Sequence, residues 1–111
     1  MRLQVKRIIL FTPNIDKMAA FYGERLGLRL VTDDSGWKEF EAGGCVIALH
    51  RGISKPGTKA PKIVFHAANV AKAQAWLKTR KIGAGPIRSF EKIDLCDFKD
   101  PDGNMLQISN R

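Results

Sequence analysis

Hydrophobic and polar positions alternate over several short stretches of this chain, and two longer stretches have helical spacing. Residues 4–12 are rich in β-branched and aromatic side chains and end at Pro13, which predicts a strand leading into a turn. Asn14 is a good helix N-cap, and apolar residues recur at helical spacing over residues 15–26 until Gly27 ends the pattern. Three strand-like stretches follow, at residues 28–32, 37–41 and 45–50. The first half is therefore predicted to be βαβββ.

The second half of the chain repeats this order. Residues 62–67 are strand-like, Asn69 is a second N-cap, and an apolar stripe over residues 70–77 predicts a helix whose pattern ends at Gly83. Three more strands are expected, at residues 87–90, 93–99 and 104–109. We therefore expect two βαβββ modules in tandem, module 1 at residues 1–50 and module 2 at residues 61–111, joined by an aperiodic basic connector at residues 51–60.

The composition is that of a globular chain, and its charge is uneven. Hydrophobic residues make up 44% and charged residues 27% of 111 residues, and no apolar run is long enough for a secretory signal or a membrane span. We expect a cytoplasmic protein with no membrane partner. The net charge is +8, and residues 51–92 hold ten Lys or Arg against one acid. Such a segment attracts anions, including nucleic acid. Nucleic-acid binding ranks last among our hypotheses, because Phe65 and Trp76 are expected in the core and few aromatic rings are left for stacking.

Several motifs occur in an order and spacing that resemble a known superfamily. The first strand runs into Asn14-Ile15-Asp16, Phe21-Tyr22 is followed by Leu26-Gly27-Leu28, and Asp100-Pro101-Asp102-Gly103 is followed by Asn104-Met105-Leu106-Gln107. Through these motifs the chain resembles, over nearly its whole length, the vicinal oxygen chelate (VOC) superfamily. This superfamily includes glyoxalase I, bleomycin-resistance proteins, fosfomycin-modifying enzymes and extradiol dioxygenases. The resemblance implies one VOC domain over residues 1–111, with an α+β fold in which each module curls its mixed sheet into a cup with helices outside. It also implies a homodimer.

In metal-dependent members of that superfamily, four inward side chains, typically His and Glu, hold one divalent ion. By the resemblance these positions fall on Arg7, Ala48, Lys62 and Gln107. A guanidinium has no lone pair to donate, alanine has no donor atom, and a protonated ammonium repels a cation. The Gln107 amide is at best a weak oxygen ligand. We therefore expect neither a metal nor another cofactor.

Strand alternation groups these positions with other polar side chains. Because residues i and i+2 of a strand share a face, His50 and His66 lie on the inward face, and Trp37 and Glu39 are plausible additions from the third strand. The opposite parity is apolar throughout and is expected to face the helices: Ile8, Leu10, Ile47, Leu49, Ile63, Phe65, Leu106 and Ile108. The predicted ligand-binding residues are therefore Arg7, Trp37, Glu39, His50, Lys62, His66 and Gln107.

These residues leave several functions open, and none of them is assigned a catalytic role. The preferred hypothesis is a metal-independent protein that binds a small anionic or polar ligand, held by Arg7, steered by Lys62 and covered by Trp37. The second is a glyoxalase-like lyase, isomerase or epimerase, in which Glu39 or a histidine is the general base and Arg7 and Lys62 stabilise an enolate-like charge in place of the metal.

Three simpler or rarer interpretations stand beside these hypotheses. Arg7 and Glu39 could form a purely structural ion pair, while Lys62 extends its amine to water. A noncanonical metal site could use both His50 and His66. The two cysteines, Cys45 and Cys96, fit neither a disulfide framework nor a Cys-paired zinc site and are expected to be inert, buried thiols.

Overall fold

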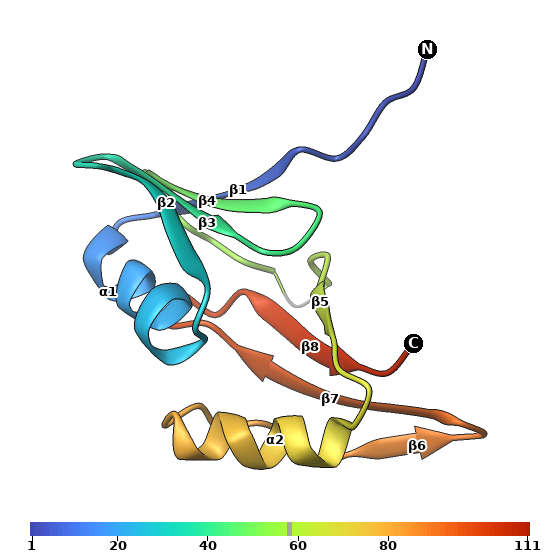
Figure 1. Ribbon diagram of the computed structural model, residues 1–111. Helices are drawn as coiled ribbons and strands as arrows, with labels where there is room; N and C mark the ends of the chain where they lie inside the picture. Colours follow the sequence, from blue (N-terminus) through green and yellow to red (C-terminus); the bar gives the residue numbers. More distant parts are fainter. Residues whose placement is uncertain (58) are drawn as a thin grey trace. The chain divides into compact units, whose positions relative to one another are not determined.

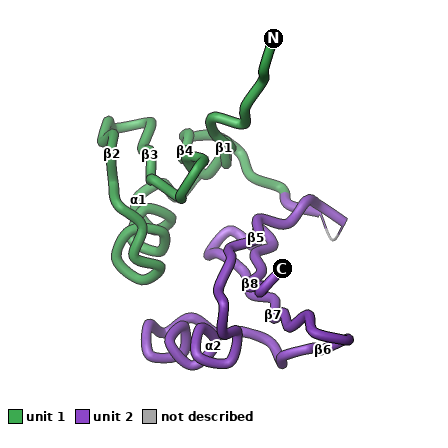
Figure 2. Tube along the Cα trace, turned by 45° about the vertical axis from the view of Figure 1, so that its right-hand side comes forward, with its two compact units in different colours: residues 1–55 green, residues 56–111 purple. Residues whose placement is uncertain are grey.

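The computed structural model describes every residue of the chain except residue 58, and the chain divides into two compact units. Unit 1 is Met1–Lys55 and unit 2 is Pro56–Arg111 (Figure 2). Each unit holds one four-stranded mixed sheet and one helical segment (Figure 1). The repeated strand–helix–strand order that the sequence predicts is therefore present in both halves.

Unit 1 contains β1 (Arg7–Thr12), α1 (Ile15–Ala19), η1 (Ala20–Arg25), β2 (Arg29–Asp34), β3 (Trp37–Glu41) and β4 (Val46–Arg51). Its strand order is β1-β4-β3-β2, with β1 parallel to β4 and the other pairs antiparallel. Unit 2 contains β5 (Ile63–His66), α2 (Val70–Thr79), β6 (Arg88–Phe90), β7 (Ile93–Lys99) and β8 (Met105–Ser109). Its order, β5-β8-β7-β6, has the same pattern of one parallel and two antiparallel pairs.

The alternate strand residues that the sequence predicts to be apolar form the face of each sheet that packs on the helices. Ile8 and Leu10 lie opposite Ile47 and Leu49, and in unit 2 Ile63 and Phe65 lie opposite Leu106 and Ile108. Burial is complete only on the central strands: Ile47, Leu49, Leu106 and Ile108 are buried, whereas Ile8 on the edge strand β1 is exposed. An edge strand has neighbours on one side only, so its side chains keep more contact with solvent.

The first helix departs from the sequence prediction at its start and in its second half, but not at its end. Asn14 does not cap it: in the described structure its side chain makes no capping bond, and its backbone N–H instead donates to Thr12 Oγ1 at 3.0 Å. After Ala19 the helix widens into the π-helical segment η1, and Leu26 N–H bonds to Phe21 O at 2.8 Å. Gly27, with φ of 82°, ends the helix as predicted.

The second helix begins as predicted but ends earlier. The Asn69 side chain accepts from Lys72 N–H at 3.0 Å, which confirms the predicted cap. The helix stops at Thr79, not near Gly83, because Lys81 takes the left-handed conformation with φ of 61°. Lys81 N–H bonds to Lys78 O, and Ile82 N–H bonds to Leu77 O, which is a Schellman motif with lysine at the position that usually holds glycine.

Two expectations about the core are also wrong. Trp76 is 44% exposed on the outer side of α2, where the Arg80 guanidinium lies 5.6 Å from its ring centre, because the buried side of α2 is provided by Val70 and Leu77. Of the two thiols, Cys96 is buried but Cys45 is only half-buried. Among the described residues, no helix is long and apolar enough to span a lipid bilayer.

Candidate functional site

The polar face of the unit 1 sheet carries an ion pair that spans three strands. Arg7 on β1 donates from Nε to Glu39 Oε2 on β3 at 3.1 Å. Ala48 on β4 lies between these strands, directly opposite Glu39, and is fully buried. Since alanine has only a methyl group, the long Arg7 side chain can reach over it. The structure thus forms the Arg7–Glu39 pair that the sequence left open.

Glu39 is held as a carboxylate by several donors. The indole of Trp37 donates to it and lowers its pKa most, and desolvation opposes this effect, while hydrogen bonds from Arg7 and Thr32 lower the pKa further. The Glu39 side chain is only 14% exposed, and its carboxylate accepts hydrogen bonds from Trp37, Arg7 and Thr32. A carboxylate with a lowered pKa and satisfied acceptors is a weak general base.

Three aromatic rings lie beside this pair on the same face. The Trp37 and His50 rings meet edge to face, with centres 5.4 Å apart, and the His50 and Phe11 ring centres are also 5.4 Å apart. These residues are direct neighbours across β3, β4 and β1 in the strand register. Phe11 was missed by the sequence analysis, although it stands four residues after Arg7 and therefore on its face.

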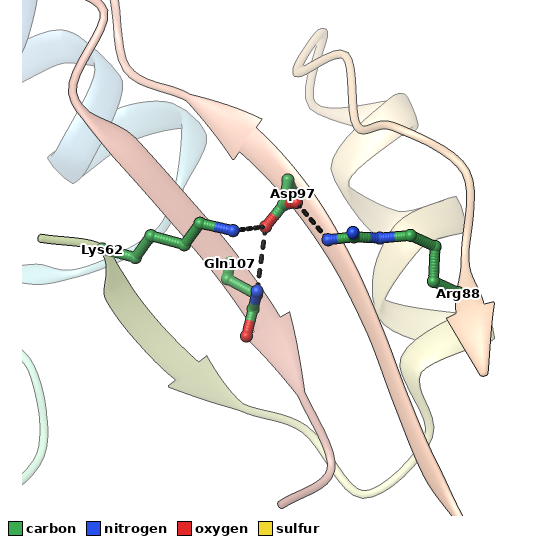
Figure 3. Close-up of polar contacts among 4 residues, drawn as sticks. All are labelled: Lys62, Arg88, Asp97 and Gln107. Carbon is green, nitrogen blue, oxygen red and sulfur yellow. Dashed lines mark hydrogen bonds and ion pairs between the residues drawn. The ribbon is translucent and has the colours of Figure 1, made fainter. Parts of the chain in front are cut away.

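The equivalent face of unit 2 carries a larger cluster centred on Asp97 (Figure 3). Lys62, which immediately precedes β5, donates from Nζ to Asp97 Oδ1 at 3.0 Å, and Gln107 Nε2 donates to the same oxygen at 2.9 Å. Arg88 on β6 donates from Nη2 to Asp97 Oδ2 at 2.6 Å. The simpler interpretation that Lys62 only extends into water is therefore wrong, because it forms an ion pair.

The pKa of Asp97 is also lowered. Desolvation raises it, but the hydrogen bonds from Gln107 and Lys62 and the positive charges of Lys62 and Arg88 outweigh that effect. Asp97 is therefore ionised at neutral pH, and it neutralises only one of the two cations that touch it.

The two clusters occupy matching places in the two sheets. Glu39 on β3 lies opposite Ala48 on β4, and Asp97 on β7 lies opposite Gln107 on β8. In each unit the carboxylate on the third strand is bound by a cation at the start of the first strand, Arg7 or Lys62. This internal correspondence agrees with the tandem modules inferred from the sequence.

Comparison with known proteins decides the family. A family model described as the Glyoxalase/Bleomycin resistance protein/Dioxygenase superfamily matches residues 4–108. The chain belongs to this superfamily. The predicted family and its α+β fold are thereby confirmed, and a comparison with curated proteins finds no significant match.

Several solved structures have the same fold. A glyoxalase/bleomycin resistance protein/dioxygenase from Nocardioides has 18% identity and a TM-score of 0.84, with 98% of this chain and 83% of that chain covered. Lactoylglutathione lyase from Agrobacterium tumefaciens has 18% identity and a TM-score of 0.77, with coverage of 96% and 92%. TnmS3, an antibiotic binding protein from Streptomyces sp. CB03234, has 20% identity and a TM-score of 0.77, with coverage of 96% and 94%. At these identities the likeness shows the fold alone.

The residues of this superfamily member do not fit the divalent ion that metal-dependent relatives hold. Of the four positions that the resemblance assigns to ligands, two carry cations, one carries a methyl group and one carries an amide. The nearby carboxylates of Glu39 and Asp97 are engaged by Arg7 and Lys62. In the part of the chain that the structure describes, no three His, Cys, Asp or Glu side chains gather into a possible metal site.

The structure connects six of the seven predicted site residues to a cluster. Arg7, Glu39, Trp37 and His50 adjoin one another in unit 1, and Lys62 and Gln107 share Asp97 in unit 2. His66 is exposed on β5 opposite Ser109, and the contacts of the described residues do not link it to that cluster. Asp97 and Arg88 were missed, although aligning the two modules would place Asp97 on the strand that matches the strand of Glu39.

Proposed function

We propose that this chain binds small polar or anionic ligands without a metal ion, on the polar sheet face of each unit, which carries the Glu39 cluster in unit 1 and the Asp97 cluster in unit 2. The observation that carries this proposal is the cation on each sheet face, Arg7 in unit 1 and Lys62 in unit 2, which the resemblance assigns to positions that hold metal ligands in metal-dependent relatives. Each cation retains hydrogen-bond donors. Arg7 uses Nε for Glu39, so its terminal nitrogens can donate to a ligand in parallel, and Lys62 uses one of its three ammonium protons.

The aromatic rings of unit 1 support binding of a ligand with a flat apolar part. Phe11 is exposed and Trp37 is half-buried, and the His50 ring lies between these two rings and contacts both. Aromatic faces next to fixed polar donors are the usual lining of small-molecule sites. TnmS3, whose fold this chain shares, is described as an antibiotic binding protein, which supports binding as a function compatible with this fold.

The state of Glu39 favours binding over base catalysis. A lyase, isomerase or epimerase that used Glu39 as its general base would need a pKa near the working pH. The donors around Glu39, foremost the Trp37 indole, lower its pKa instead. We therefore rank an enzyme that depends on Glu39 below a binding protein.

Nucleic-acid binding is still ranked below small-ligand binding, but one feature of the structure supports it that the sequence did not predict. Trp76 and Phe90 are exposed within the basic segment of residues 51–92. Aromatic rings among cations suit base stacking, but single-strand binding normally uses several adjacent stacking platforms. Binding of single-stranded DNA that weakens steeply with salt and is lost in Trp76→Ala would support this candidate instead.

A ligand screen that uses the two tryptophans as a matched pair tests the proposal. Polar and anionic metabolites are added to the full chain in EDTA and, separately, with divalent ions, and thermal stability is measured. A ligand at 100 times its Kd should stabilise the protein by about 2.7 kcal/mol in EDTA. Trp37→Leu, on the ligand face, should reduce this effect, whereas Trp76→Leu, on the outer side of α2, should keep it. Stabilisation only with divalent ions, or equal effects of the two variants, would contradict the proposal.

We also propose that the two units fold as one domain and that the chain forms a homodimer in the cytoplasm, as the resemblance implies. A single unfolding transition is expected for one domain. Light scattering should give twice the 12.4 kDa chain mass. Two separate transitions, or a monomer mass at micromolar concentration, would contradict these two points.

A further inference from the structure

The cluster in unit 2 already holds the Asp97 carboxylate between two cations, Lys62 and Arg88, in the way that a protein would hold the carboxylate of a bound ligand. The two oxygens of Asp97 have different partners: Oδ1 accepts from Lys62 and Gln107, and Oδ2 accepts from Arg88. The three donors come from separate parts of the unit 2 sheet, namely the residue before β5, strand β8 and strand β6 (Figure 3). Their geometry therefore matches the flat, two-oxygen shape of a carboxylate.

The two units differ in the charge that remains on this face. In unit 1 one cation, Arg7, meets one carboxylate, and the other donors to Glu39 are the neutral side chains of Trp37 and Thr32. In unit 2 two cations meet one carboxylate, so the Asp97 cluster has a net charge of +1. An anion is therefore attracted more strongly to the unit 2 cluster than to the neutral pair of unit 1.

Both cations of unit 2 are accessible and have donors to spare. The Lys62 side chain is 32% exposed and the Arg88 side chain is 59% exposed. The ammonium has two further protons, and the guanidinium has four N–H groups besides the one that meets Asp97. A second carboxylate can therefore approach from the solvent side, either adding to Asp97 or displacing it.

We propose that Lys62, Arg88 and Gln107 form a binding site on unit 2 for an anionic group of a ligand, that this group is a carboxylate, and that Asp97 is an internal competitor which limits its affinity. This inference rests on the proposed function, and it adds Arg88 and Asp97 to the residues that determine specificity.

The probes are benzoate and benzamide, which have the same shape and differ in charge. Both are titrated into the isotope-labelled full chain in EDTA, and binding is followed by NMR chemical shifts of the backbone amides. Benzoate should bind more tightly than benzamide and should shift the amide signals around Lys62, Arg88 and Gln107. Asp97→Asn removes the competitor and should tighten benzoate by about 3-fold to 10-fold, with no change for benzamide.

Variants that remove a cation should have the opposite effect. Lys62→Gln and Arg88→Gln should each weaken benzoate by about 3-fold to 10-fold, and Arg88→Lys should retain most of the affinity. Asp94→Asn, on the same strand as Asp97, and Lys78→Gln, on α2, change charge elsewhere in unit 2 and should leave the benzoate affinity within about 2-fold. The dispersion of the NMR spectrum shows whether each variant is folded.

Three results would overturn the inference: no benzoate binding, equal affinities for benzoate and benzamide, or weaker benzoate binding in folded Asp97→Asn. If any of these occurs while other metabolites still bind in EDTA and depend on Trp37, the proposed function stands and only the carboxylate site is wrong. If no polar or anionic compound binds at all, the proposed function fails and the carboxylate site fails with it.

Discussion

Lys81 sits in a backbone conformation that lysine disfavours, so Lys81→Gly should stabilise the protein. Its φ of 61° is the left-handed position of a Schellman motif, closed by the 2.9 Å bond from Ile82 N–H to Leu77 O. An L-residue in this conformation costs about 1–2 kcal/mol. Glycine removes that strain but costs about 0.5–1 kcal/mol of additional chain entropy on folding. The expected net gain is therefore about 0.5–1 kcal/mol.

Thermal unfolding monitored by circular dichroism measures this effect. The gain corresponds to a rise of about 2–4 °C in Tm for a domain of this size. Lys78→Gly is the matched control, because Lys78 is exposed within the same helix at helical φ and ψ, and glycine there should cost about 1 kcal/mol. Gly83→Ala tests whether the helix ends before Lys81, as in the structure, or at Gly83, as the sequence predicts. A Cβ at Gly83 meets open space, so little change in stability is expected. A lower Tm for Lys81→Gly, or the same sign for both lysine variants, would refute the reasoning.

Three further predictions concern packing, acid sensitivity and thiol chemistry. Gly23→Ala should lower stability by about 1–2 kcal/mol in denaturant unfolding, because the added Cβ would lie 2.9 Å from Cε1 of the buried Phe40 ring, and a higher stability would contradict this close approach. The donors around Glu39 lower its pKa below 4.5 on folding, so its stabilising effect is complete above that pH and is lost as the pH falls through the folded value. Glu39→Gln should therefore make Tm less sensitive to acid below about pH 4.5, and an unchanged acid profile would contradict the assignment. Burial raises the pKa of Cys96, so a thiol reagent should modify half-buried Cys45 first and reach Cys96 only on unfolding; equal rates in the folded protein would contradict this order.

Much of the fold could be predicted because its signals are local. Strands alternate with a period of two residues, so the sequence identifies their apolar face, and turns such as residues 100–103 mark where one strand ends and the next begins. The repetition of these signals predicted the two βαβββ modules. The helix ends were harder to predict from the sequence: Asn69 caps α2 as predicted, whereas Asn14 does not cap α1. A capping residue requires a backbone geometry that the residue type alone does not guarantee.

The sequence predicted the residues of the unit 1 cluster, but it did not predict the central carboxylate of the unit 2 cluster. Arg7, Trp37, Glu39 and His50 share one face by parity, and the structure indeed places them next to one another. The partner of Lys62 was not predicted, because Asp97 lies 35 residues away and meets it across the intervening strand β8. Similarly, the helical spacing of Trp76 resembles that of a core residue, yet the outer face of α2 has nothing to bury it.

The sequence alone therefore determined the order of elements and the face on which each strand residue lies, since these depend on local periodicity. Only the tertiary structure decided which cation meets which carboxylate and how much charge is left over. Those properties depend on strand order and register, which bring together residues that no local pattern connects.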